Sequence, residues 1–341
     1  MCPRGAGVRS GTQGQAQGVD IDHQEADWVS IHERICQLLI PIHTSLPFFS
    51  SEKERKHGME QLLNRQKYII DVAQSTAQKF ILEGEPGKAI PAGLQALRFS
   101  IRVYGACSVD VVPAYLLLAE ACMDAGCLMQ ATTYLSQAQW LILKTPACSL
   151  AVQLKLHRDL GLLYAAKGDL EQSLYHLAND IYLASCAFGP DAVQAAEGYF
   201  HMAKIFLRQN KTDVANSLFA EVTAIWHAFL LKSVQTQEQI LKTQPTRLFL
   251  SGAAEAQQTE AIQALNTILD FREKAPKQQP DGTAKVLHSL AMLYYLNGDL
   301  SKAREMGAKA LDLMKQLPQQ ESLEAVDHLL NLINSKPCYG K

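Results

Sequence analysis

The 341-residue chain lacks several features that would place it in a familiar functional class. Lys and Arg total 32 against 34 for Asp and Glu, so there is no net charge to attract nucleic acid or an anionic membrane. No run of about 18 apolar residues is free of charge, and the first residues contain no apolar signal segment. We therefore expect a protein of the cytoplasm or cytoskeleton that binds neither nucleic acid nor membrane.

The eight cysteines form no CxxC pair. Cys122 falls within an apolar repeat and Cys186 within an apolar helix, and intracellular thiols stay reduced. We expect reduced cysteines that pack as small apolar residues; a disulfide framework is the minor alternative.

The motifs of common enzyme classes are missing as well. The sequence contains no P-loop, no GxGxxG after a strand, no GxSxG and no HExxH. It also lacks the Asn-His-x-Cys string of SET-domain methyltransferases, which sometimes accompany zinc fingers and helical repeats. The segment His157-Arg158-Asp159 is similar to the start of a kinase catalytic loop, but the other kinase motifs are absent. We predict no enzymatic activity and no catalytic residue, and a methyltransferase-related protein is the weakest hypothesis.

What the chain does contain is a repeat with a step of 42 residues. Small residues recur at this step, and a second small residue follows each by twelve: Ala77 and Ala89, Ala119 and Ala131, Gly161 and Ser173, Ala203 and Ala215. A bulky residue follows each first small one by three: Phe80, Cys122, Tyr164 and Phe206. The frame returns at Ala291 and Ala303. Facing small residues let two antiparallel helices approach, and Gly or Asn between them indicates the turn.

This pattern resembles the tetratricopeptide repeat, with a period longer than the usual ~34 residues. Families with long helices, such as the kinesin light chain type, are similar in that respect. The predicted fold class is all-α: a tetratricopeptide-like helix-pair solenoid over residues 51–334, preceded by a shorter helical segment at 21–41. We expect residues 1–20 to be disordered and 335–341 to form a loose tail. The predicted repeats lie near 70–105, 112–145, 154–188, 196–232, a degenerate 238–273 and 284–316, with a capping helix at 319–334.

Two helices are predicted ahead of the first repeat. Trp28, Ile31 and Ile35 give one apolar helical face, which we expect Pro41 to close. Ser51 and Glu54 form a possible capping box, and the helix behind it can run into the first repeat and end near Gly84.

The segment HQEADWVSIHERIC, from His23 to Cys36, resembles the closing half of a MYND zinc finger. This resemblance places His23, His32 and Cys36 on ligand positions and Trp28 beside the zinc. The earlier ligands are missing, and position 19 holds Val. Structural zinc needs four ligands, so we expect residues 21–41 to be a remnant without bound metal. In the alternative, relatives with a complete finger do bind zinc, and residues 1–20 replace the first half of the finger here.

Together, the finger remnant and the long repeats resemble axonemal proteins that join a MYND finger to tetratricopeptide repeats. The resemblance is carried by HQEADWVSIHERICQLLIP (23–41), PAYLLLAEA (113–121) and HLANDIYLASCAFG (176–189). It implies a non-catalytic component of cilia and sperm flagella that is needed for flagellar motility and male fertility. The implied partners are inner-arm dynein components and another tetratricopeptide protein of the axoneme.

Within such a solenoid, the first helix of each pair lines a concave face that can hold a peptide or helix. The groove-facing positions of the repeats predict these partner-binding residues: Gln74, Gln78, Ile81, Leu116, Glu120, Met123, Arg158, Leu162, Phe200, Lys204, His288 and Tyr295. The alternative function is a chaperone or trafficking adaptor that grips a terminal carboxylate. Of its clamp positions only Lys155 fits, and Asp159 would repel the ligand.

Overall fold

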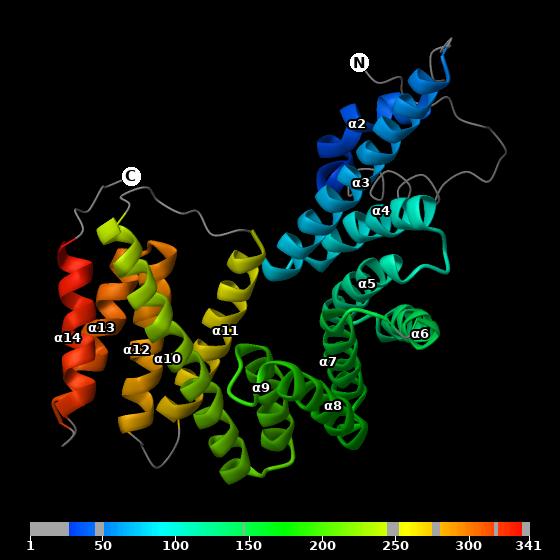
Figure 1. The fold of residues 1–341 in the computed structure, drawn as a ribbon. Coiled ribbons are helices and arrows are strands. Elements are labelled where there is room, and N and C mark those ends of the chain that lie inside the picture. The colour runs from blue at the N-terminus through cyan, green and yellow to red at the C-terminus, as the bar shows by residue number, and fades with distance from the viewer. Residues whose placement is uncertain are drawn as a thin grey trace, which may run out of the picture. The chain divides into compact units, whose positions relative to one another are not determined.

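A computed structural model describes residues 27–44, 51–145, 147–243, 252–274, 280–316 and 320–335 (Figure 1). Within these ranges the regular structure is helical and contains no strand, so the predicted all-α fold is confirmed. The helices form two compact units, residues 1–159 and 160–341. The predictions for residues 1–20, His23 and the tail beyond 335 lie outside the described residues.

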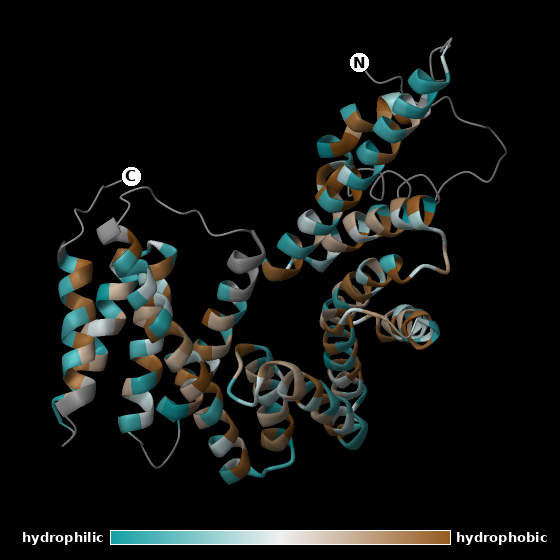
Figure 2. Ribbon diagram, viewed as in Figure 1, coloured by the Kyte–Doolittle hydropathy of each residue, from teal (hydrophilic) through white to brown (hydrophobic). Residues whose placement is uncertain are grey.

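The first unit is built from antiparallel helix pairs. Helix α3 (Glu52–Leu82) pairs with α4 (Pro86–Tyr104), and α5 (Val112–Asp124) pairs with α6 (Leu128–Lys144) after the short 3-10 helix η2 (Val109–Val111). Helix α7 (Leu150–Lys167) opens the third pair and crosses the unit boundary. Each helix carries apolar and polar residues together, as expected where only one face is buried (Figure 2).

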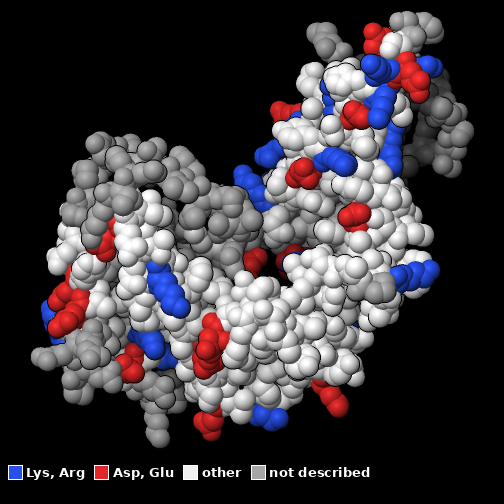
Figure 3. Space-filling model, viewed as in Figure 1, with Lys and Arg blue, Asp and Glu red and all other residues white. Residues whose placement is uncertain are grey.

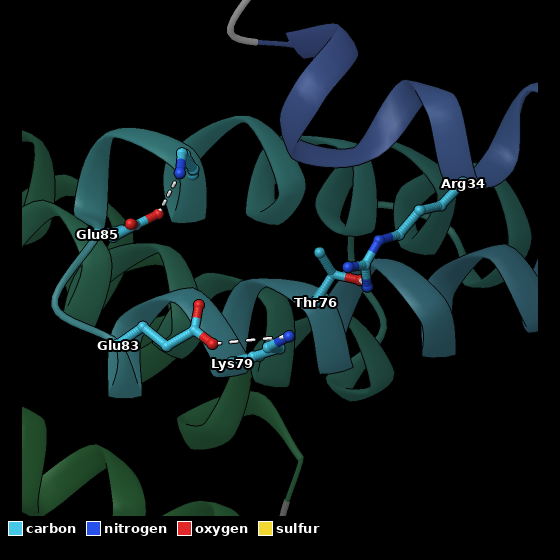
Figure 4. A network of polar contacts seen from close by, with 6 residues as sticks. Arg34, Thr76, Lys79, Glu83 and Glu85 are labelled. Atoms are coloured by element: carbon cyan, nitrogen blue, oxygen red, sulfur yellow. Dashed lines mark hydrogen bonds and ion pairs between the residues drawn. The ribbon is translucent and has the colours of Figure 1, made fainter.

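The helix ahead of the repeats docks on α3 and α4. It begins with the π-helical turn η1 (Trp28–His32) and continues as α2 (Glu33–His43). Ile31 and Ile35 are fully buried in the apolar cluster that includes residues of α3 and α4. Arg34 Nη1 donates to Thr76 Oγ1 of α3 at 3.3 Å, as Figure 4 shows.

Of the two helix ends predicted ahead of the first repeat, one is confirmed and the other is wrong. The capping box is present: Ser51 Oγ accepts from the Lys53 N–H, and Glu54 accepts from the Ser51 N–H. Pro41, however, does not close the preceding helix, which continues to His43. Pro41 lies in the last turn, where its missing N–H removes a single helical hydrogen bond.

The second unit continues the pairs. Helix α8 (Leu170–Phe188) follows α7, α9 (Val193–Arg208) pairs with α10 (Thr212–Thr243), and α12 (Pro280–Asn297) pairs with α13 (Leu300–Met314). Helix α11 (Gly252–Lys274) packs beside α12. Helix α14 (Gln320–Ser335) packs on α13 through buried Val326, Leu329 and Ile333, as expected of a capping helix.

Small residues hold the pairs together at the predicted positions. All ten are buried: Ala77, Ala89, Ala119, Ala131, Gly161, Ser173, Ala203, Ala215, Ala291 and Ala303. In each of these pairs the first helix ends with the same hydrogen bond. This bond involves the bulky residue that lies three positions after the first small residue. Its carbonyl accepts from the N–H five residues later, as in Tyr164 O to Asp169 N (3.0 Å) and Tyr294 O to Asp299 N (2.9 Å). This is the Schellman bond that closes a helix before a left-handed residue.

The interval predicted as a degenerate repeat, 238–273, differs from that prediction. Helix α10 runs unbroken through 238 to Thr243, and α11 begins at Gly252. The described part of the interval is therefore the end of one long helix and most of a single helix, whereas Pro245 lies outside the described residues. Ala261 on α11 is buried in the core of the second unit.

Helix α10 has the length and composition to cross a membrane, over Thr212–Ile240. Its apolar residues Phe219, Val222 and Trp226 are instead buried in the core of the second unit. Length and composition alone do not separate a membrane span from a core helix. The cysteines within the described residues are free, and burial raises the pKa of the Cys122 thiol to about 11.

Candidate functional site

The first unit contains a cavity lined by the first helices of three successive pairs. Its volume is about 380 Å³, and its walls come from α3, α5 and α7. The lining residues are Gln74, Ser75, Gln78, Pro113, Leu116, Leu117, Ala151, Val152 and Lys155. We call this cavity the α3/α5/α7 groove.

Helical spacing explains why these residues meet. Pro113 and Leu116 to Leu117 lie one turn apart on α5, and Ala151 to Val152 and Lys155 lie one turn apart on α7. The next turn on the same faces brings Glu120 from α5 and Asp159 from α7. The apolar lining therefore gives way to a charged cluster along both helices.

One ammonium group is shared by two carboxylates in that cluster. Lys155 Nζ donates to Glu120 Oε2 at 2.8 Å and lies 3.6 Å from Asp159 Oδ1. The Asp159 side chain is 1% exposed, and neither of its oxygens has a hydrogen-bond partner. The side chains of Lys155 and Glu120 are 34% and 20% exposed, so both reach solvent.

Burial sets the proton affinities of this cluster. Burial raises the pKa of Asp159 above the ordinary carboxyl value, against the opposing effect of Lys155. Burial lowers the pKa of Lys155, but Asp159 and Glu120 outweigh it, so its pKa is raised and the ammonium stays charged. Burial and the nearby Glu120 also raise the pKa of Asp124. Burial is thus the main cause of the raised pKa of both Asp159 and Asp124.

The structure brings together part of the predicted partner-binding set. Gln74, Gln78 and Leu116 line the α3/α5/α7 groove. Glu120 accepts a hydrogen bond from Lys155, which also lines the groove. Ile81, Met123 and Arg158 are partly buried within the same unit. Ser75 and Pro113 were missed, although each lies within one helical turn of a predicted position; Ala151 and Val152 were also missed and lie about two turns before Arg158.

The predicted residues of the second unit are mostly inaccessible. His288 and Tyr295 are 1% and 2% exposed within the core, so neither side chain is free to contact a partner. Phe200 is also buried, and the Lys204 ammonium lies 5.5 Å from its ring centroid. Leu162 is partly buried, which leaves Lys204 as the exposed member of this set.

His288 belongs to a buried histidine pair. His227 Nε2 and His288 Nδ1 are 3.1 Å apart, and one of the two nitrogens must donate to the other. Burial lowers the pKa of His227 to about 4 and that of His288 to about 3, with Lys285 and His227 respectively adding to the effect. Both rings are therefore neutral at physiological pH.

Two of the predicted ligand positions of the MYND-like segment, His32 and Cys36, lie within the described residues. Trp28 is 47% exposed and stacks on His32 with ring centroids 5.0 Å apart, rather than packing in an interior. His32 and Cys36 lie one turn apart, and no group of three potential ligands occurs among the described residues. His23 is outside them. His32 and Cys36 provide two potential ligands, whereas structural zinc takes four.

Charges of both signs are mixed on the surface. In Figure 3 the region that Figure 1 labels α2 and α3 carries Lys and Arg next to Asp and Glu, without separation by sign.

The chain matches no known family model. Among solved structures it is similar to the tetratricopeptide-like repeats of a putative kinesin light chain from Podosopora anserina. That likeness has a TM-score of 0.39 and 14% identity, covering 74% of this chain and 97% of the other. A second similar structure is BtubC (BKLC) from P. vanneervenii, with a TM-score of 0.37 and 11% identity over 74% of this chain and 93% of that one.

Proposed function

We propose that this chain is a non-catalytic protein-interaction scaffold that holds a partner segment in the α3/α5/α7 groove. The observation that carries the proposal is the groove itself. The first helices of three successive pairs line it together, and a peptide segment can bind in a groove between helices. The same helix faces were predicted from the repeat register to meet a partner.

The cellular setting in this proposal comes from the resemblance to axonemal MYND-finger tetratricopeptide proteins. We assign the chain to the ciliary or flagellar axoneme, in association with inner-arm dynein components and another tetratricopeptide protein, with a role in sperm motility and male fertility. The strings 23–41, 113–121 and 176–189 support this assignment.

The charged cluster argues against the alternative of a chaperone adaptor that grips a terminal carboxylate. Lys155, the one suitable clamp residue, is already held by Glu120 and lies beside the buried Asp159. An incoming carboxylate would meet two negative groups around a single ammonium, which disfavours its binding.

The test is a comparison of two tryptophan variants in affinity purification from testis or ciliated cells. Ala151 is exposed and lines the groove, so Ala151→Trp fills the groove from its rim without disturbing the core. Ala178 on α8 is also exposed but lies outside the groove, and Ala178→Trp is the matched control. We expect inner-arm dynein components to be lost with Ala151→Trp and retained with Ala178→Trp. Equal recovery with both variants would overturn the groove assignment.

A further inference from the structure

The charged end of the α3/α5/α7 groove has an imbalance that the free chain does not resolve. Glu120, Asp124 and Asp159 supply three carboxylates, against the cations Lys155 and Arg158. Arg158 acts on the charges of both Lys155 and Asp159, and it has contacts of its own. Among these groups, two carboxylates, Glu120 and Asp159, share the single ammonium of Lys155.

The geometry shows where the imbalance is concentrated. Lys155 Nζ is within hydrogen-bond distance of Glu120 Oε2, at 2.8 Å, but 3.6 Å from the nearer oxygen of Asp159. Both Asp159 oxygens are buried without a hydrogen bond. A buried acceptor without a hydrogen-bond donor is unfavourable, whichever way the side chain is protonated. The Lys155 ammonium is close enough to hydrogen-bond Glu120, but its contact with Asp159 is longer.

A second cation placed at Glu120 would remove this conflict. Glu120 is the accessible member of the pair, because 20% of its side chain is exposed whereas Asp159 is 1% exposed. When an incoming basic group pairs with Glu120, Lys155 is released to move toward Asp159. It then donates a hydrogen bond to an Asp159 oxygen that has no donor in the free chain. Every carboxylate of the pair would then have its own donor, as buried charges require.

We propose that the α3/α5/α7 groove recognises a protein segment in which apolar residues adjoin a Lys or Arg, and that this basic side chain pairs with Glu120 while Lys155 turns to Asp159. The apolar part of the segment contacts Pro113, Ala151 and Val152, which line the groove and remain at least partly exposed. This proposal rests on the proposed function and adds the chemistry of the partner to it.

The probe is a phage-displayed library of random 12-residue peptides, selected on the full chain. We expect the selected peptides to be enriched in Lys or Arg next to apolar residues. In synthetic versions, replacing the basic residue by Met should weaken binding to the wild-type chain about fivefold to tenfold, as judged by fluorescence polarisation. This measurement needs no protein variant.

Glu120→Gln is the decisive protein variant, because it removes the charge and nearly keeps the shape. The Lys-to-Met replacement in the peptide should have almost no effect on binding to Glu120→Gln. Glu221 is exposed on α10 in the other unit, and Glu221→Gln as control should leave the fivefold to tenfold effect intact.

Each remaining outcome has a definite meaning. Selected peptides that lose binding to Ala151→Trp but are acidic, or contain no basic residue, would overturn the proposed chemistry and leave the groove function standing. Peptides that bind wild type and Ala151→Trp equally would overturn both proposals, and so would a library from which no peptide is enriched.

Discussion

Replacing Gly161 by Ala tests whether the 42-residue period is a packing rule. Gly161 is the first small residue of the third repeat, on α7. A Cβ built there would lie 2.8 Å from Leu177 Cγ, 2.9 Å from Leu177 Cδ2 and 3.4 Å from the Ser173 carbonyl. Leu177 is fully buried, so it has little room to withdraw. Both contacted residues belong to α8, the partner helix of the pair.

Two opposing effects set the expected magnitude. Overpacking of a tight core costs about 1–3 kcal/mol. Replacing Gly by Ala inside a helix contributes about 1 kcal/mol of stability through backbone entropy. Gly161→Ala should therefore lower the free energy of unfolding by about 0–2 kcal/mol, since the steric cost exceeds the propensity gain.

A second glycine separates the two effects. Gly87 lies in the first turn of α4, is exposed, and has no atom within 4 Å of its built Cβ. Gly87→Ala should be neutral or stabilising. The difference between the two variants, measured by urea unfolding followed by circular dichroism, then isolates a steric cost of about 1–3 kcal/mol.

The double variant Gly161→Ala/Leu177→Ala identifies the contact responsible. Removing the Leu177 side chain should relieve the overlap, so the double variant should be more stable than the sum of the single effects by more than about 0.5 kcal/mol. Strict additivity, or a Gly161→Ala variant as stable as Gly87→Ala, would refute the packing argument.

Two further predictions concern acid stability and the docked amino-terminal helix. The pKa values of His227 and His288, about 4 and about 3 in the fold, are below the usual unfolded value of ~6.5, so stability is complete above pH 6.5 and falls with pH below it. At pH 5 the buried His288 alone should cost about 2 kcal/mol, so urea unfolding of His288→Gln should show a loss between pH 7.5 and pH 5 that is smaller by that amount; an equal loss would contradict the assignment. Ile35→Ala, at a fully buried site, should cost about 2–5 kcal/mol by urea unfolding, whereas Ile40→Ala, where the side chain is 44% exposed, should cost far less; similar effects would show that α2 is not docked as described.

The groove could be predicted in part because it depends on helix register. Gln74, Gln78 and Leu116 were placed by their positions in the repeat, and a helical period maps such positions onto one face. The shared ammonium could not be predicted, because the link from Lys155 to Glu120 joins two helices whose separation is a tertiary distance. The electrostatic cluster appears only when these side chains are placed in three dimensions.

The burial of His288 and Tyr295 has a similar explanation. The repeat position of His288 equals that of Gln74 and Leu116, which line the groove in the first unit, but α12 packs against α10, α11, α13 and α14. A helix covered on several sides buries residues that would otherwise face solvent. At His288 the covering neighbour is α10, where His227 Nε2 lies 3.1 Å from His288 Nδ1.

The sequence by itself therefore determined the helix pairs and their turns, because small residues, bulky residues and left-handed turn residues act within one pair. Ala77, Ala119, Gly161 and Ala203 are buried at the predicted step of 42 for that local reason. The tertiary structure alone decided which positions remain accessible, how α10 and α11 replace a fifth pair, and which carboxylates share Lys155. These outcomes depend on contacts between helices far apart in the chain, and a repeat pattern carries no information about such contacts.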